Sequence, residues 1–177
     1  MFGYGSLLWN PGFDFDDRAV ARLWGFQRSF CMWSIHHRGT PENPGLVLAL
    51  DRTDGAFCDG LAFHVPAQTS EKTLDYLRDR ELISSAYVED HQEISLRDGR
   101  QVESLVYVVD PTHSQYCGGL SLERQAQVIA GAVGGRGPNP DYLWMTAQHL
   151  HDLGLGDDNL DWLATRVRET LAAGQTT

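Results

Sequence analysis

Residues 87–109 read YVEDHQEISL-RDGR-QVESLVYVV, two runs of β-forming residues on either side of a four-residue break. The break contains Asp98-Gly99, a dipeptide that tolerates the positive φ of a tight hairpin turn. The segment therefore predicts a β-hairpin with strands at Tyr87–Leu96 and Gln101–Val109. We expect this hairpin to join a larger sheet.

The chain before residue 66 consists of short apolar runs separated by turn signals, which is typical of strands. The candidate strands are Phe2–Tyr4, Ala19–Phe26, Arg28–Ser34, Leu46–Leu50 and Leu61–Val65. Asp54-Gly55 predicts another hairpin turn between the last two of these runs. The aromatic residues Trp24, Phe26, Phe30 and Trp33 alternate with small and polar residues, so we expect them to fill the core of a mostly antiparallel sheet.

A helical pattern follows over Gln68–Arg80, where Thr69 or Ser70 can cap the N-terminus. This predicts a short helix with Glu81 at or beyond its end.

The last third of the chain predicts three helices. One begins at Ser121, one at Asn139-Pro140, since proline favours the first helical position, and one near Asn159. The glycine-rich spacer Gly134–Pro138 is expected to form a turn or loop.

Strands first and helices later favour an α+β fold, with a bent mixed sheet or small barrel partly covered by helices. The regular strand–helix alternation of a doubly wound fold is missing. Because 177 residues suit one core, we expect residues 1–177 to form a single domain.

Composition argues against several classes of partner. A formal charge of -10 with 14 Lys plus Arg disfavours binding to nucleic acids and anionic membranes. No stretch approaches the ~18 apolar residues of a membrane span, and Met1–Ser6 has no signal-peptide pattern. The 3 cysteines are odd in number and far apart, which suits a reducing compartment. We expect a soluble, cytoplasmic protein.

Familiar cofactor and metal patterns are incomplete. Gly3–Leu8 has Leu8 at the third glycine position of a dinucleotide-binding loop. His36-His37 would point to opposite faces of a strand, with no further ligand at suitable spacing. We therefore expect neither a cofactor nor a metal ion. A thiol hydrolase stays open as an alternative, although no local signature marks an activated cysteine.

Several segments together resemble the ChaC-like γ-glutamylcyclotransferases. They are Tyr4-Gly5-Ser6-Leu7, Trp9-Asn10-Pro11-Gly12-Phe13, His37-Arg38-Gly39-Thr40-Pro41-Glu42 and Arg80-Glu81, followed by Asp110-Pro111, Gln115-Tyr116 and Asn139-Pro140-Asp141-Tyr142-Leu143. The likeness covers nearly the whole chain. His36 departs from the family pattern, in which an acidic residue often precedes the arginine-containing loop.

The resemblance implies the γ-glutamylcyclotransferase fold and a lyase activity that releases 5-oxoproline and cysteinyl-glycine from glutathione. It also implies that the turn Tyr4–Leu7 forms the pocket for the γ-glutamyl group and that Glu81 is catalytic. In such a reaction the substrate's own α-amine attacks the γ-carbonyl, so no nucleophilic side chain is required.

The chemistry suggests a role for each candidate residue. Glu81 would act as base toward the α-ammonium and then as acid toward the leaving amine. Backbone N–H groups of Gly5–Leu7 would hold a carboxylate or the developing oxyanion, and Tyr4 would orient the site. Tyr116 is a further expected pocket residue. Arg38 would attract the second carboxylate of the substrate, or would be a structural arginine.

Two other functions fit the same pattern. The leaving group could belong to other γ-glutamyl amino acids or γ-glutamylamines, or the chain could be a catalytically silent relative that binds the γ-glutamyl group. The sequence leaves the oligomeric state open.

Overall fold

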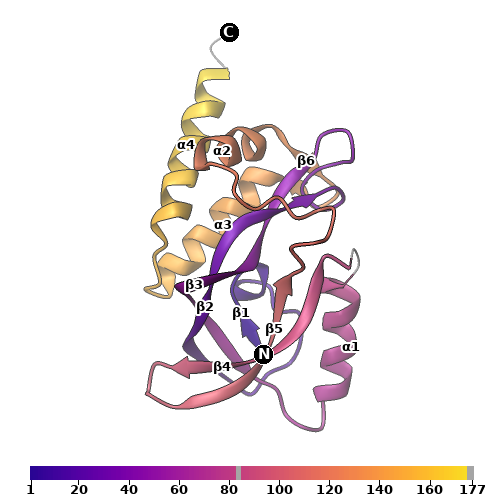
Figure 1. Cartoon of the computed structure of the whole chain (residues 1–177), viewed down its shortest axis with the longest axis vertical. Coiled ribbons are helices and arrows are strands. Elements are labelled where there is room, and N and C mark those ends of the chain that lie inside the picture. The colour runs from indigo at the N-terminus through magenta and orange to yellow at the C-terminus, as the bar shows by residue number, and fades with distance from the viewer. Residues whose placement is uncertain (83–84, 175–177) are drawn as a thin grey trace. The chain divides into compact units, whose positions relative to one another are not determined.

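The computed structural model describes residues 1–82 and 85–174 (Figure 1). In chain order its elements are β1 (Phe2–Gly3), the 3₁₀ helix η1 (Ser6–Leu8), β2 (Asp17–Ser34), β3 (Gly45–His64), α1 (Ser70–Glu81), β4 (Tyr87–Leu96), β5 (Gln101–Val109), α2 (Leu122–Gly131), β6 (Val133–Gly134), β7 (Gly137–Pro138), α3 (Asn139–Asp152) and α4 (Asp158–Gly174). The predicted α+β class is confirmed. Within the part of the chain described, no helix has both the length and the apolar character needed to cross a membrane.

The chain divides into two compact units. The first contains Met1–Ser29 and Ala49–Tyr116, and the second contains Phe30–Leu48 and Cys117–Thr177. β2 and β3 each contribute residues to both units. The expectation of one domain over residues 1–177 stays a prediction.

The main sheet has the strand order β1-β3-β2-β4-β5, with an additional pairing between β3 and β5. That pairing is parallel and joins Leu50 to Val108, whereas the β1–β3, β2–β4 and β4–β5 pairings are antiparallel. The additional pairing closes β3, β2, β4 and β5 into a ring. The sheet is thus a small mixed barrel, as the sequence predicts.

The hairpin of β4 and β5 forms as expected. Its register runs from the pair Tyr87–Val109 to the pair Ser95–Gln101, around the turn at Asp98-Gly99. Its inward side chains join the core cluster of the first unit, whose buried members are Phe2, Tyr4, Ala21, Leu23, Phe26, Leu50, Cys58, Ile94, Leu96, Val106 and Val108. Burial of this apolar surface is the main force that holds the strands together.

The predicted hairpin turn at Asp54-Gly55 is wrong, because both residues lie inside the continuous strand β3. The two halves of β3 pair with different partners, Leu50 with β5 and Ala62 with β1. The strand therefore continues through Asp54-Gly55 without reversing, because each half has a different partner strand. Pairing with these distant strands overrides the local preference for a turn.

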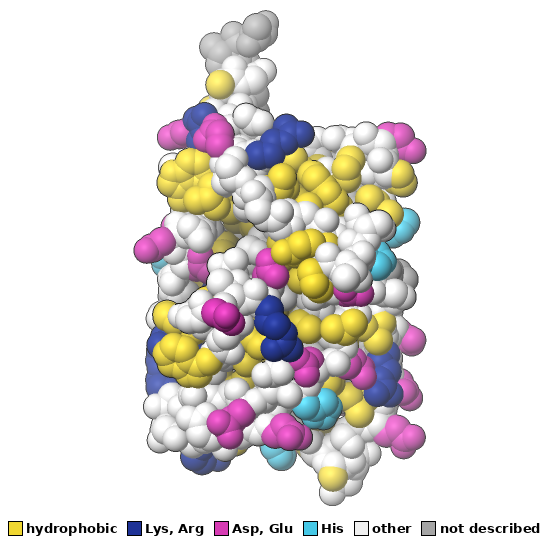
Figure 2. Space-filling model, in the orientation of Figure 1, with side chains coloured by type: hydrophobic (Ala, Val, Ile, Leu, Met, Phe, Trp, Pro, Cys, Tyr) yellow, Lys and Arg dark blue, Asp and Glu magenta, His cyan; other side chains and the backbone are white. Residues whose placement is uncertain are grey.

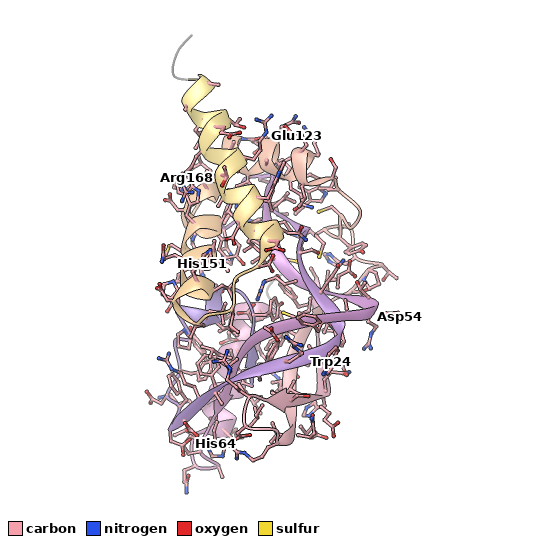
Figure 3. All side chains as sticks on the ribbon, turned by 90° about the vertical axis from the view of Figure 1, so that its left-hand side faces the viewer. Trp24, Asp54, His64, Glu123, His151 and Arg168 are labelled. Atoms are coloured by element: carbon pink, nitrogen blue, oxygen red, sulfur yellow. The ribbon has the colours of Figure 1, made fainter. Side chains whose placement is uncertain are left out.

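Trp24 is a second correction, because 54% of it is exposed, whereas Phe26 and Phe30 are buried. Strand alternation would place Trp24 and Phe26 on the same face. Gly25 separates them with φ 79°, and such a positive φ is typical of a β-bulge that shifts the alternation by one residue. Trp24 consequently lies on the outer face (Figure 3), where its ring meets Phe57 edge-on at 5.5 Å.

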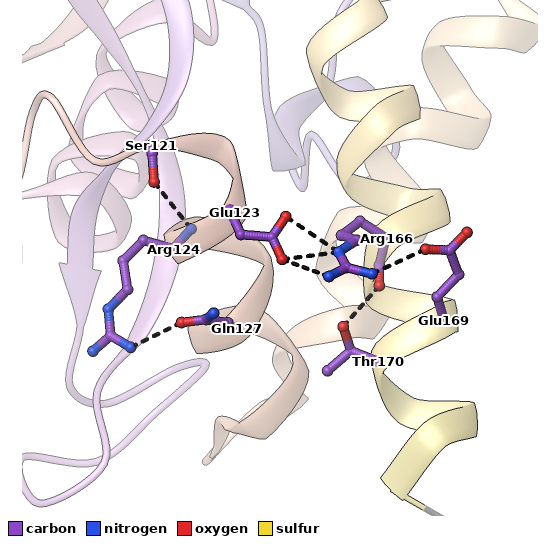
Figure 4. A network of polar contacts seen from close by, with 7 residues as sticks. All are labelled: Ser121, Glu123, Arg124, Gln127, Arg166, Glu169 and Thr170. Carbon is purple, nitrogen blue, oxygen red and sulfur yellow. Dashed lines mark hydrogen bonds and ion pairs between the residues drawn. The ribbon is translucent and has the colours of Figure 1, made fainter.

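The second unit contains the three predicted terminal helices, α2, α3 and α4. The Ser121 side chain accepts a hydrogen bond from the backbone N–H of Arg124 and caps α2 as expected. The spacer Gly134–Pro138 is a turn closed by the two-residue strands β6 and β7. An ion-pair network links two of the helices (Figure 4): the Arg166 guanidinium on α4 contacts the Glu123 carboxylate on α2 at 2.6 Å and the Glu169 carboxylate at 3.2 Å.

Asn139, the first residue of α3, ties this helix to β3. It is fully buried, and its side-chain Oδ1 accepts from the Leu46 N–H at 2.7 Å while its Nδ2 donates to the Leu46 carbonyl at 2.8 Å. The side-chain amide thus makes the two hydrogen bonds that a neighbouring strand would otherwise make.

We expect Asn139→Ala to lower the free energy of unfolding by about 2–4 kcal/mol, because it leaves two buried backbone groups of Leu46 without partners. Urea unfolding of parent and variant measures the loss. Asn43→Ala is the matched control, since the Asn43 side chain also donates to a backbone carbonyl but is exposed. Equal losses in the two variants would contradict the assignment.

Candidate active site

The segment Tyr4–Leu7 leaves β1 and turns into the 3₁₀ helix η1. The Gly5 carbonyl accepts from the Leu8 N–H at 2.9 Å, and the Ser6 carbonyl accepts from the Asn10 N–H at 2.9 Å. The first N–H groups of a helix have no partner inside it. The predicted tight turn after the first strand is therefore present, with amide groups at its start that a helix does not itself satisfy.

Tyr4 anchors this turn to the barrel. Its hydroxyl donates to the Tyr107 carbonyl on β5 at 3.0 Å, and its own carbonyl accepts from the Arg28 guanidinium at 3.0 Å. Arg28 is itself buried and also donates to the carbonyl of Asp59 on β3. Tyr4 is thus held by β5, through the carbonyl of Tyr107, and by β2, through the side chain of Arg28.

Glu81 is the last residue of α1, and its side chain is 17% exposed. The preceding residue, Arg80, contacts it through Nε, 3.0 Å from the Glu81 Oε1. A second nitrogen of the same guanidinium, Nη2, donates to the Ser6 Oγ at 2.8 Å. The Arg80 guanidinium therefore connects the candidate acid/base, Glu81, to a turn near the N-terminal start of the same unit.

Arg80 also binds the loop that follows η1. Its Nη1 donates to the carbonyls of Asn10 at 2.7 Å and Pro11 at 3.1 Å, and to the Tyr76 hydroxyl at 3.1 Å. Gly12 completes the contact, with φ 75° and the Tyr76 hydroxyl occupying the space of a Cβ. Only glycine fits at this position without displacing Tyr76.

A second carboxylate, Glu89 on β4, lies across the hairpin from Tyr107. Its Oε1 accepts from the Arg78 Nε at 2.9 Å and from the Tyr107 hydroxyl at 3.0 Å. The hydrogen bond from Arg78 is the main cause that lowers the pKa of Glu89. Burial, followed by the hydrogen bond to Glu89 and by the charges of Glu89 and Glu81, raises the pKa of Tyr107, so the phenol stays protonated at neutral pH.

Arg38 belongs to the second unit, where it is buried. Its Nη1 donates to the Pro138 carbonyl at 3.1 Å, and its guanidinium lies over the Tyr142 ring, 5.5 Å from the centroid. Burial lowers the pKa of Arg38. These contacts agree with the structural-arginine alternative, and a role toward a substrate stays a prediction.

Tyr116 lies in the first unit, where its hydroxyl donates to the Asp51 carboxylate on β3 at 2.8 Å. Its expected place in a substrate pocket also stays a prediction. Across the described ranges 1–82 and 85–174, no three His, Cys, Asp or Glu side chains are grouped to hold a metal ion.

A family model described as "ChaC-like protein" matches residues 1–170. The chain belongs to the ChaC-like family. The resemblance inferred from the sequence motifs is thereby confirmed, and the match includes residues of both compact units.

Individual members of this family and solved structures agree with the match. An Escherichia coli protein named glutathione-specific gamma-glutamylcyclotransferase is 38% identical over 172 residues, which is 97% of this chain and 74% of the relative. Arabidopsis thaliana gamma-glutamylcyclotransferase 2-1 is 34% identical, covering 97% of this chain and 82% of the relative. A crystal structure of a glutathione-specific gamma-glutamyl cyclotransferase from yeast superposes with a TM-score of 0.85 at 24% identity, covering 97% and 98% of the two chains. This structural likeness shows the fold.

Sequence reasoning gave no role to Arg80 and did not name four further polar residues around the candidate site, namely Arg28, Arg78, Glu89 and Tyr107. A signal existed for two of them, because a hairpin that turns at Asp98-Gly99 places Glu89 opposite Tyr107. Arg28 was also conspicuous as a charge inside an apolar strand, and a buried charge requires partners.

We expect Gly12→Ala to destabilise the protein by about 2–4 kcal/mol, because the added methyl group must displace Tyr76 and the positive φ disfavours alanine. Urea unfolding measures the change. Gly25→Ala separates the two causes: Gly25 has φ 79°, but a methyl group added there would meet nothing within 4 Å, so only the φ cost of about 1–2 kcal/mol applies. Similar losses at both positions would rule out the contact with Tyr76 as the reason.

Proposed function

We propose that this chain is a glutathione-specific γ-glutamylcyclotransferase that needs no cofactor. The observation that carries the proposal is the connection of Glu81 to the turn at Ser6 through one guanidinium, because it puts a carboxylate next to the segment expected to bind the γ-glutamyl group. The name of the Escherichia coli relative supports the choice of glutathione.

The proposed reaction is an intramolecular cyclisation. The α-amine nitrogen of the γ-glutamyl group forms a bond to the γ-carbonyl carbon, and the bond from that carbon to the cysteinyl nitrogen breaks. The products are 5-oxoproline and cysteinyl-glycine. The attacking nitrogen loses two protons as the α-ammonium becomes the lactam N–H, and the departing nitrogen gains two as it becomes the ammonium group of cysteinyl-glycine, so the step consumes neither an oxidant nor water. Holding the substrate in the ring-forming geometry can supply up to about 7–11 kcal/mol of the barrier reduction.

Glu81 is the better of the two carboxylates for the proton transfer. Glu89 is bound by Arg78 and Tyr107, and its lowered pKa makes it a weak base. Glu81, in contrast, is connected through Arg80 to Ser6 of the turn proposed to bind the γ-glutamyl group. The choice of Glu81 therefore rests on this connection to the proposed binding turn.

The turn Gly5–Leu7 is the proposed site for the α-carboxylate or the oxyanion of the substrate. Tyr4 acts in this proposal by holding the turn, since its hydroxyl is bound to the carbonyl of Tyr107. Glutathione is an anion and the protein carries a charge of -10, with acidic side chains spread over the face in Figure 2. A cation that meets the second carboxylate of glutathione would offset this repulsion; Arg38 stays the residue proposed for this role, with Tyr116 as a further proposed pocket residue.

The proposed partner is thus a small molecule, and the proposed place of action is the cytoplasm. A broader substrate range is the second candidate, because the Arabidopsis thaliana relative is named as a gamma-glutamylcyclotransferase without reference to glutathione. In that case other γ-glutamyl amino acids or γ-glutamylamines would react by the same chemistry.

We expect Glu81→Gln to lower kcat by about 100- to 10,000-fold, because the amide cannot accept the proton from the substrate α-ammonium. The measurement is formation of 5-oxoproline and of free amine from glutathione and, separately, from γ-glutamyl-alanine. Glu71→Gln is the matched control on the same helix, where Glu71 is exposed. Its turnover should equal that of the parent.

The two substrates distinguish the candidates. Preference for γ-glutamyl-alanine would keep the chemistry and reject glutathione specificity. Binding of glutathione without turnover of either substrate by the folded parent would replace the enzyme by the silent binding relative. Parent-like turnover by Glu81→Gln would remove Glu81 from the mechanism.

Iodoacetamide should leave turnover of glutathione intact near neutral pH. Burial raises the pKa of the Cys117 thiol to about 12, and Cys31 and Cys58 are each 3% exposed, so reactive thiolate is scarce. Mass spectrometry measures the alkylation of the native protein alongside 5-oxoproline formation. Loss of activity in proportion to modification of one cysteine would favour the thiol hydrolase.

A further inference from the structure

We propose that Arg80 is a positioning residue whose three guanidinium nitrogens hold the Glu81 carboxylate in register with the substrate-binding turn. Catalysis then depends on the forked shape of arginine as well as on its positive charge. The inference rests on the proposed function, because it assigns how that same site is assembled.

The three nitrogens of the guanidinium together reach three segments, and Nη1 also donates to the Tyr76 hydroxyl within α1. Nε contacts Glu81 at 3.0 Å, Nη2 donates to the Ser6 hydroxyl at 2.8 Å, and Nη1 donates to the Asn10 and Pro11 carbonyls at 2.7 and 3.1 Å. The end of α1, the turn and the following loop therefore share one planar group. Lysine could supply the charge, but its single nitrogen cannot reproduce this planar arrangement of donors.

Burial distinguishes Arg80 from an ordinary surface arginine. Its side chain is 8% exposed, whereas Arg78, on the same helix, is 49% exposed and forms an ion pair with Glu89 at the surface of the hairpin. Removing a guanidinium from water is costly unless its donors find acceptors. The acceptors of Arg80 come from separate segments, so satisfying its donors also sets the positions of those segments.

The arrangement gives the motif Trp9–Phe13 a role that sequence reasoning did not find. The carbonyls of Asn10 and Pro11 accept hydrogen bonds from Nη1, and Gly12 lets the loop approach Tyr76 closely because it has no Cβ. With Nη1 held by this loop, Nε and Nη2 are directed toward Glu81 and Ser6. The loop thus orients the arginine, and the arginine orients the carboxylate.

The consequence for catalysis is geometric. A general base must come within about 2.6–3.2 Å of the atom whose proton it takes. A displacement of about 1 Å in such a group can cost on the order of 100-fold in rate. Loss of the Arg80 contacts would allow both Glu81 and Ser6 to leave their present positions.

The test compares kcat and KM for 5-oxoproline formation from glutathione in the parent, Arg80→Gln and Arg80→Lys. We expect kcat to fall by about 10- to 100-fold in both variants, since neither side chain can join the three segments. Arg166→Gln is the matched control, because Arg166 also joins a carboxylate on another helix and lies in the second unit (Figure 4). Its kcat should equal that of the parent.

A merely structural arginine would give a different result. Arg80→Gln would then lower the melting temperature while the folded variant kept the kcat of the parent, and the inference would be overturned. If Arg80→Gln does not fold, the Arg80→Lys variant provides the test. A kcat equal to that of the parent in the folded lysine variant would show that the planar guanidinium is not required and would overturn the inference.

A double-mutant cycle with Ser6→Ala tests the link to the turn. We expect the loss in Arg80→Gln/Ser6→Ala to be smaller than the product of the two single losses, because both substitutions break the same contact. Independent losses would overturn the coupling. If the parent itself forms no 5-oxoproline, the proposed function fails and the inference fails with it, whereas an active parent with a fully active Arg80→Gln rejects the inference alone.

Discussion

The buried guanidinium of Arg80 is the constraint on which the candidate site depends. A cation that is almost withdrawn from water must have its donors satisfied by protein groups, and those of Arg80 are shared among Glu81, Ser6 and the loop after η1. Segments that are far apart in the chain are thereby brought to one group. The carboxylate and the turn become a single polar unit rather than two neighbours on separate elements.

The barrel supplies the support behind that unit. The 20-residue strand β3 pairs with β1 at one end and with β5 nearer the other, while the Tyr4 hydroxyl binds the backbone of β5. The turn is therefore attached to the barrel in two ways: through β1, which pairs with β3, and through the Tyr4 hydroxyl, which bonds to β5. Across the hairpin, the bonded pair of Glu89 and Tyr107 keeps a second carboxylate occupied.

Local patterns in the sequence were enough to predict the β4–β5 hairpin, the helix that ends at Glu81 and the three later helices, because turn residues and apolar periodicity act over a few residues. The expected cap of α1 was wrong, since the Thr69 and Ser70 hydroxyls donate to the Pro66 and Ala67 carbonyls instead. Local patterns also failed at Asp54-Gly55 and at Trp24, where pairing with distant strands and the positive φ of Gly25 decided the outcome. The motif residues Ser6 and Glu81 were identified as candidates, but the contacts of Arg80 with residues 6–11 were not, since no spacing rule relates an arginine to so distant a stretch of the chain. Long-range polar geometry of this kind requires the folded chain.

Asn139 also determines which backbone groups of β3 are open to further strand pairing at Leu46. A strand that ends a sheet displays N–H and C=O groups that can recruit a foreign strand and start edge-to-edge aggregation. At Leu46 both groups are already taken by the side-chain amide of Asn139. These two backbone groups of Leu46 are therefore not available for pairing with another strand.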